Sequence, residues 1–259
     1  MTPATDQPTD LPEAYGAFAW AYDGALGKRF FRAAKRLLTP LLRIPAANKT
    51  HLDLCCGTAL AVEFFTKHGY RSVGVDASLP MLRVGRRRAR GLTAGDVRAL
   101  PLRGTFDRIT CLYDSLNHLQ QRDELVAVFT EVRRLMHPGS IFLFDMNHPD
   151  IYPAVWGMKE PFVESGPTFH LEIATRYARA DKRGHALITG WAILPDGERV
   201  AIRETHEQRA WSRREIVGCL TEAGLVARQV TEFDPFEEGR VVKLVFTCGA
   251  QPSSTIAPP

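Results

Sequence analysis

The sequence predicts an α/β fold in which helices cover both faces of a mostly parallel β-sheet. The first observation is the segment Leu52–Ala59, a short apolar stretch with one acid that breaks into a loop of small residues. A helical pattern follows and ends at Gly69, so the segment predicts strand, tight loop and helix. The second observation is that residues 51–147 repeat this alternation, with several strands apolar throughout, as expected when both sheet faces are covered.

The elements can be predicted in chain order. A helix is expected over Ala14–Leu42, where apolar residues recur at helical spacing, with Pro40 and Pro45 closing it. A later helix should run from about Asp123 to Met136 and stop at His137-Pro-Gly. The strands of this region are expected near residues 51–54, 72–76, 92–95, 107–113 and 141–146.

After Asn147 the pattern changes to the strict alternation of antiparallel strands. Three strands separated by turns predict a three-stranded antiparallel insert over residues 165–211. Ser212-x-x-Glu215 is a capping box that should open a helix running to Ala223. Two final strands are expected at residues 225–232 and 241–248, which completes one domain over residues 14–250.

Composition agrees with a single globular domain. The chain has 259 residues, 45% of them apolar, and no stretch long enough to span a membrane. The polar, Pro-rich start lacks the features of a secretion signal, so residues 1–13 and 251–259 are expected to be loose tails. The five cysteines form no Cys-x-x-Cys pair, which favours reduced thiols and a cytoplasmic protein.

The net charge of +4 owes much to the run from Arg83 to Arg90. One interpretation is a helix that contacts nucleic-acid phosphates, and the other is the solvated face of a surface helix. The run has no aromatic neighbours and no RNA-binding module accompanies it, so we favour the solvated face and expect neither a nucleic-acid nor a membrane partner.

Three acids at successive strand ends indicate the ligand. Asp53 lies inside the first strand, where its carboxylate would repel a pyrophosphate but would suit a ligand with a positively charged end, such as S-adenosylmethionine. Asp76 ends the next strand, where a βαβ unit bonds ribose hydroxyls, although alone it could be a helix cap. Asp96 could accept from an adenine amino group while the Val97 N–H donates to the ring.

At these positions the chain resembles class I S-adenosylmethionine-dependent methyltransferases of the small-molecule type, such as amino-sugar and glycine N-methyltransferases. The resemblance covers roughly residues 15–248 and rests on Asp53–Ala59, Gly74–Leu82, Gly95–Val97, Phe106–His118 and His137–Asp145. It implies a Rossmann-like, seven-stranded, mostly parallel sheet and a monomer or homodimer. One departure is that Cys55 and Ala59 replace two glycines of the family's first loop, where a positive φ would be strained.

The resemblance also implies a cofactor site and a lid. The N-terminal helical segment, residues 14–45, would cover the cofactor with Tyr15 and Tyr22, which lie seven residues apart on one predicted helix face, although both could instead be packing residues. The implied cofactor-binding residues are Tyr15, Tyr22, Asp53, Cys55, Gly57, Thr58, Asp76, Ala77, Met81, Asp96, Val97, Leu112, Tyr113 and Asp114.

The loop Tyr113–His118 is the best place for acceptor chemistry. A methyl acceptor must present a neutral lone pair, and His118 could take up its proton, with Tyr22 as the second catalytic candidate. Amino-sugar N-methyltransferases resemble this chain in having a histidine at the matching position. Asp145 and Asn147 at a strand tip could orient the acceptor, as could His206 and Gln208, which share one side of an insert strand with Glu204.

Other functions are weighed against the motifs that they require. No Asn-Pro-Pro-Tyr-like loop follows the fourth strand, no Pro-Cys pair is present, and no G-x-G-x-x-G loop supports an NAD-dependent oxidoreductase. Asp114, Asp145 and Asn147 could imitate the ligands of a metal-assisted catechol enzyme, but we expect no metal. We therefore predict methyl transfer to a small molecule, most simply at an amine nitrogen; the alternatives are an O-methyltransferase and a non-catalytic S-adenosylmethionine-binding protein.

Overall fold

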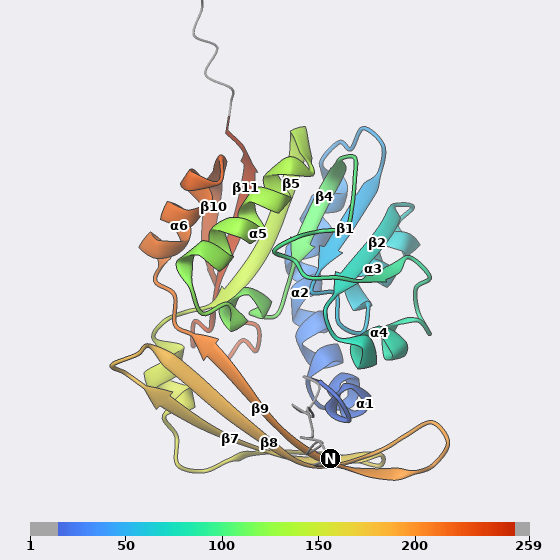
Figure 1. Cartoon of the computed structure of the whole chain (residues 1–259), viewed down its shortest axis with the longest axis vertical. Coiled ribbons are helices and arrows are strands. Elements are labelled where there is room, and N and C mark those ends of the chain that lie inside the picture. The colour runs from blue at the N-terminus through green and yellow to red at the C-terminus, as the bar shows by residue number, and fades with distance from the viewer. Residues whose placement is uncertain (1–14, 252–259) are drawn as a thin grey trace, which may run out of the picture.

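The computed structural model describes residues 15–251 and contains the predicted seven-stranded, mostly parallel sheet (Figure 1). The predicted tails lie outside the described residues, apart from Gln251. Strands β1 to β5 pair in parallel, whereas β11 runs antiparallel to both β5 and β10. In spatial order the strands are β10 (Leu225–Phe233), β11 (Lys243–Ala250), β5 (Met136–Asn147), β4 (Phe106–Cys111), β1 (Thr50–Leu54), β2 (Arg71–Asp76) and β3 (Leu92–Ala94).

Helices cover both faces of this sheet because successive β5 side chains point to opposite sides. Phe142 and Phe144 pack with α5 (Arg122–Arg134) and α6 (Arg213–Glu222). Ile141 and Leu143 pack on the other face with α2 (Lys28–Arg43) and α3 (Leu60–Lys67). The predicted capping box of Ser212 and Glu215 opens α6. Within residues 15–251, no helix combines the length and apolarity that a bilayer crossing requires.

The insert after β5 forms a second sheet below the ends of the parallel strands (Figure 1). The prediction of three strands is wrong by one, because the short and mostly exposed β6 adds an edge strand that lacks an alternating pattern. The sheet runs in the order β6 (Phe162–Gly166), β7 (Phe169–Ala178), β8 (Arg183–Ile193) and β9 (Arg199–Arg209), and the single-turn helix η3 (Tyr152–Trp156) precedes it.

The N-terminal segment departs from the predicted continuous helix. Tyr15 lies in a turn with φ 59°, followed by α1 (Phe18–Tyr22), the π-helix η1 (Asp23–Gly27) and α2. Pro40 lies inside α2 and does not close it; the helix ends where Ile44 turns extended, as a residue before proline does. The helix-face argument for Tyr15 and Tyr22 is therefore wrong, although their rings still meet at 6.2 Å.

Two further boundaries differ from the sequence prediction. α5 ends at Arg134, and β5 begins almost at once at Met136, so His137-Pro-Gly belongs to the strand. The pairing of β4 with β5 shifts register between Phe106 and Arg108, which absorbs the irregular start of the strand.

A buried lysine joins the two sheets. Lys243 opens β11, and its ammonium contacts Asp114 and lies 3.4 Å from the Asp145 carboxylate. Asp145 accepts the backbone N–H groups of Tyr113 and Asp114, both of which have positive φ. Gln208 of β9 donates to the second oxygen of Asp114 at 2.6 Å. The loop after β4 is thus held from β5, β11 and the insert at once.

We expect Lys243→Met to destabilise the protein by about 3–5 kcal/mol, because it leaves the buried Asp145 and the partly buried Asp114 without their counter-charge. Urea unfolding measures this loss. Lys67→Met is the control: Lys67 forms an exposed pair with Glu63, and its loss should cost about 0.5 kcal/mol or less. Equal losses in the two variants would mean that the buried cluster contributes no more than a surface pair.

Candidate active site

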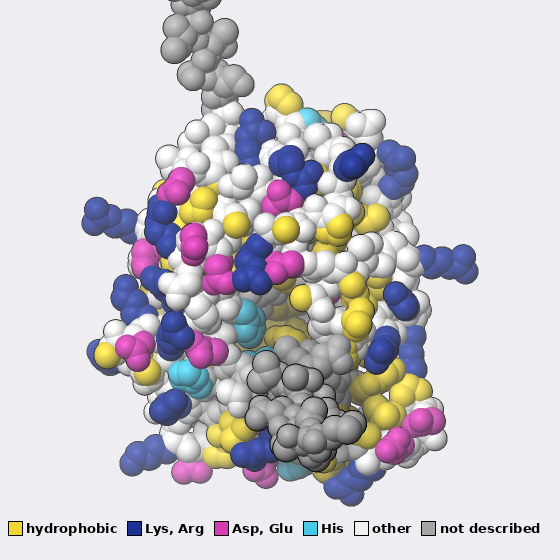
Figure 2. Space-filling model, viewed as in Figure 1, with side chains coloured by type: hydrophobic (Ala, Val, Ile, Leu, Met, Phe, Trp, Pro, Cys, Tyr) yellow, Lys and Arg dark blue, Asp and Glu magenta, His cyan; other side chains and the backbone are white. Residues whose placement is uncertain are grey.

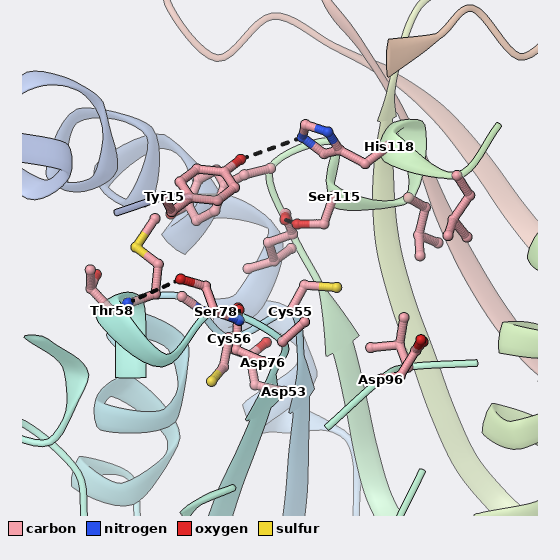
Figure 3. Close-up of a pocket in the computed structure, with 18 of the residues that line it drawn as sticks. Tyr15, Asp53, Cys55, Cys56, Thr58, Asp76, Ser78, Asp96, Ser115 and His118 are labelled. Carbon is pink, nitrogen blue, oxygen red and sulfur yellow. Dashed lines mark hydrogen bonds between the residues drawn. The ribbon is translucent and has the colours of Figure 1, made fainter. Parts of the chain in front are cut away.

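A cavity of about 500 Å³ opens at the carboxyl ends of the parallel strands, between the N-terminal segment and the insert. It is lined by most of the residues that the sequence singled out. These are Tyr15, Tyr22, Asp53, Cys55, Gly57, Thr58, Asp76, Ala77, Met81, Asp96, Val97, Leu112, Tyr113, His118 and His206. Asp114, Asp145, Asn147 and Gln208 do not line it. Figure 3 shows the acids at one end of the cavity and Tyr15 and His118 at the other.

The loop between β1 and α3 forms the floor of this cavity with an unusual backbone. Cys55, Gly57 and Ala59 have φ values of 51°, 51° and 65°. Glycine adopts such angles freely, but a Cβ makes them cost about 1 kcal/mol or more at each position. The strain expected if Cys55 and Ala59 replaced glycines is therefore present, and the loop keeps its tight path in spite of it.

Asp53 is buried under this loop, with its carboxylate at the cavity wall. Thr110 of β4 donates to its Oδ1 at 2.5 Å. Burial raises the pKa of Asp53 to about 7; the Thr110 bond opposes the rise and the nearby Asp76 adds to it. A cation placed beside Asp53 would favour its ionised form.

Asp76 ends β2 and faces the same cavity. Its two oxygens accept the N–H groups of Gly57 and Ser78, at 2.7 and 2.8 Å. Burial raises its pKa, and these two hydrogen bonds oppose the rise. The cap of the following helix, α4 (Leu79–Gly85), is Ser78 rather than Asp76, so the alternative that Asp76 is an ordinary helix cap does not hold.

Asp96 and Val97 lie in the turn after β3, at the cavity rim. The Asp96 carboxylate is exposed and forms an ion pair with Arg98, whose Nη2 lies 2.6 Å away. The Arg98 guanidinium lowers the pKa of Asp96. Arg98 also lines the cavity and reaches Glu124 of α5. The sequence singled out neither residue, since an Arg two positions after an acid is an unremarkable surface pattern.

The far end of the cavity is an aromatic chamber. The Tyr15 hydroxyl points at His118 (Figure 3), with an O–N distance of 3.4 Å. The Tyr15 ring also lies 4.6 Å from that of His206. Tyr22 reaches the same cavity from α1, and burial raises the pKa of its hydroxyl. The Tyr113 hydroxyl is buried without a hydrogen-bond partner in the described part of the chain. It is thus free to bond a ligand.

The hydrogen bonds around His118 determine which of its ring nitrogens carries the lone pair. Gln208 accepts through its Oε1 from Asn147 and Tyr152, so its amide NH₂ faces Asp114 and His118. His118 Nε2, 3.4 Å from that NH₂, therefore carries a lone pair. Burial lowers the pKa of His118, so the neutral ring predominates near pH 7.

The remaining predicted residues form a wall behind His118. Asn147 and Gln208 are buried and bonded to each other, and Asp114 and Asp145 share the Lys243 ammonium. A lysine ammonium already lies against the two carboxylates that could have held a divalent cation. Within residues 15–251, no group of three or more His, Cys, Asp or Glu side chains has metal-binding geometry.

Two contacts hold the N-terminal segment over the cavity. The Glu204 carboxylate accepts the N–H groups of Tyr15 and Phe18, at 2.9 and 3.2 Å. On the opposite side, Asp23 accepts from the Thr58 hydroxyl at 2.6 Å and pairs with Arg88. Arg88 belongs to the basic run predicted to be a solvated face, so that prediction is wrong for this residue. Positive and negative side chains are interspersed on the face that Figure 2 shows.

The cavity fits S-adenosylmethionine in size and in chemistry. Among residues 15–251, none of the groups that shift the pKa of the buried Asp53 or the partly buried Asp76 is a cation. These carboxylates therefore favour a ligand with positive groups and hydroxyls, and the Tyr113 hydroxyl, which has no partner in that range, can bond it. Strand, small-residue loop and helix bring Asp53 and Asp76 to the switch point of the sheet, where α/β folds bind their ligands.

Comparisons with known proteins agree with this geometry. A family model described as a methyltransferase domain matches residues 52–139. The chain is 30% identical to a dTDP-3-amino-3,4,6-trideoxy-alpha-D-glucopyranose N,N-dimethyltransferase of Streptomyces venezuelae, over 71% of its own length and 77% of that protein. It is 28% identical to a cypemycin N-terminal methyltransferase of a Streptomyces species, over 71% and 72% of the two chains.

A solved structure of an S-adenosylmethionine-dependent methyltransferase from Clostridium acetobutylicum has the same fold. The TM-score is 0.74 at 20% identity, over 92% of this chain and all of that one. Sequence relatives and fold agree with the acids at the strand ends, and the chain therefore belongs to the class I S-adenosylmethionine-dependent methyltransferases.

Proposed function

We propose that this enzyme transfers a methyl group from S-adenosylmethionine to an amine nitrogen of a small-molecule acceptor. The observation that carries the proposal is the cavity with carboxylates at one end and a chamber of polar-tipped aromatic rings at the other. The names of the relatives support nitrogen as the target, because they describe N,N-dimethylation of an amino sugar and methylation at an N-terminus.

In this proposal the acids bind the cofactor. Asp76 accepts hydrogen bonds from the ribose hydroxyls, and Asp53 faces the ammonium of the methionine end. Asp96, with the Val97 N–H, borders the adenine. The loop Cys55–Ala59 lets the backbone come close, while Tyr15, Tyr22 and Met81 cover the site from above. The bound cofactor supplies a methyl group on a positively charged sulfur.

The chamber then orients the acceptor. A neutral amine already presents a lone pair, so alignment contributes more than proton removal. His118 Nε2 is a hydrogen-bond acceptor that can receive the N–H of an amine in place of the Tyr15 hydroxyl, which lies 3.4 Å away, and take up a proton released there. Tyr15 and Tyr22, whose hydroxyls stay protonated because burial raises their pKa, exclude water and donate hydrogen bonds. The N-terminal segment acts as a lid over both ends.

Methylation of oxygen is the second candidate, and one assay separates the two. The purified enzyme is given S-adenosylmethionine and paired acceptors that differ only in an amino or a hydroxyl group, amino sugars and their hydroxyl counterparts first. We expect S-adenosylhomocysteine together with a product heavier by one methyl on nitrogen, by mass spectrometry and NMR. Methylation of the hydroxyl partner alone would contradict the proposal, and cofactor hydrolysis does not count as turnover.

We expect Asp76→Ala to weaken S-adenosylhomocysteine binding about tenfold or more, because charge-assisted bonds to the ribose hydroxyls are lost. Isothermal titration calorimetry measures the affinity. Asp76→Asn keeps one oxygen, which can serve only one of the Gly57 and Ser78 N–H groups, and should also bind more weakly, whereas the exposed Asp150→Ala should bind normally. Unchanged affinity in both Asp76 variants would remove the ribose assignment. NADH should not bind the wild type.

We expect His118→Asn to keep kcat within about tenfold of the wild type and to raise KM, since an amide still offers an acceptor oxygen for orientation. His118→Ala should lower kcat further and raise KM further. Steady-state kinetics between roughly pH 5 and 9 measure these effects. A base must be neutral to act, so a fall in kcat of about 10²-fold in His118→Asn, with loss of the acid limb, would contradict the orientation role.

A further inference from the structure

A histidine sits in the middle of the parallel sheet, where an apolar residue would be expected. His51 lies in β1, fully buried, with its ring stacked on Phe65 at 3.7 Å. Its Nδ1 is 2.6 Å from the Ser72 hydroxyl of β2, and its Nε2 is 2.9 Å from the Thr110 hydroxyl of β4. Thr110 in turn lies 2.5 Å from Asp53 Oδ1. Four polar side chains from three neighbouring strands therefore form one continuous chain that ends at the cavity.

The direction of every hydrogen bond in this chain follows from the number of protons available. An ionised Asp53 can only accept, so Thr110 donates its single proton to Oδ1. The Thr110 oxygen must then accept from His51 Nε2–H. Burial lowers the pKa of His51, which keeps the ring neutral with that one proton, and Nδ1 must accept from Ser72. All three donors point toward Asp53, and aligned hydrogen bonds strengthen one another.

We propose that His51 and Thr110 are positioning residues that act through Asp53: their hydrogen bonds favour its ionised form, whose free oxygen Oδ2 binds the cofactor. The inference rests on the proposed contact between Asp53 and the cofactor ammonium. Neither residue lines the cavity, so both act through Asp53. No hydrogen bond reaches Oδ2 from residues 15–251, which leaves that oxygen for the ligand.

The other groups that face Asp53 do not stabilise its charge. Asp76 approaches from β2 and repels it. The thiols of Cys55, Cys56 and Cys111 and the Tyr113 hydroxyl approach from the loop after β1, the end of β4 and the loop after β4. Burial raises the pKa of Tyr113, which therefore remains neutral. Burial and Asp76 raise the pKa of Asp53 to about 7, and the hydrogen bond that Thr110 donates opposes this rise.

The test is the pH dependence of S-adenosylmethionine affinity, measured by calorimetry between roughly pH 5 and 9. Affinity should fall as the pH drops, because binding to the ionised Asp53 must then expel a proton. In Thr110→Val the midpoint of this fall should move up by about one pH unit or more, since a charge-assisted donor is lost. At the alkaline end, where Asp53 is ionised in both proteins, the two affinities should converge.

Two further variants test the chain of hydrogen bonds, and a third serves as a control. Thr110→Ser keeps the hydroxyl and should restore the wild-type curve. His51→Phe keeps the stacking on Phe65 but removes the donor to Thr110, so its midpoint should move in the same direction by a smaller amount. Thr130→Val alters an exposed helical threonine and should change nothing.

The outcomes distinguish failure of the proposed contact between Asp53 and the ammonium from failure of the positioning role alone. If Asp53→Asn binds as tightly as the wild type and the wild-type curve is flat, Asp53 does not bind the ammonium, and the proposed cofactor assignment fails with the inference. If Asp53→Asn binds weakly without pH dependence, but Thr110→Val follows the wild-type curve or is weakened equally at every pH, the positioning role alone is overturned.

Discussion

The ion cluster of Lys243 with Asp114 and Asp145 is the contact on which the arrangement of the site depends. Its one ammonium bridges two carboxylates, and the cluster fixes the loop after β4 in a left-handed path. Gln208 connects that loop to the insert through Asp114. The same amide determines which ring nitrogen of His118 carries the lone pair. The ion cluster therefore holds one wall of the candidate acceptor chamber, and it contributes a defined geometry rather than much net stability.

The cavity itself concentrates unfavourable features. The buried Asp53 lies near the partly buried Asp76, and Cys55 and Ala59 have strained backbones on the cavity floor. Such features persist when surrounding contacts enforce them, and they are typical of functional sites. A ligand with a cationic end relieves the repulsion between the acids. Glu204 and Asp23 hold the N-terminal segment over the cavity from two sides, and the bond from Thr58 to Asp23 joins that segment to the loop on the cavity floor.

The sequence predicted the central sheet, its flanking helices and the acids at its strand ends, because apolar runs, caps and strand-end positions are local signals. It missed what depends on distant partners. Lys243 meets Asp114 across 129 positions, and Thr110 meets Asp53 across 57, so neither contact leaves a local pattern. The edge strand β6 and the π-helix near Tyr22 were missed because they lack the regular period that pattern reading requires.

A crystal structure of the enzyme with S-adenosylhomocysteine tests most directly how the cofactor lies in the cavity. We expect the ribose hydroxyls to lie against the Asp76 carboxylate, the ammonium to face Asp53, and the sulfur to point to the chamber of Tyr22 and His118. A cofactor whose sulfur points away from that chamber, or whose ribose makes no contact with Asp76, would contradict this expectation.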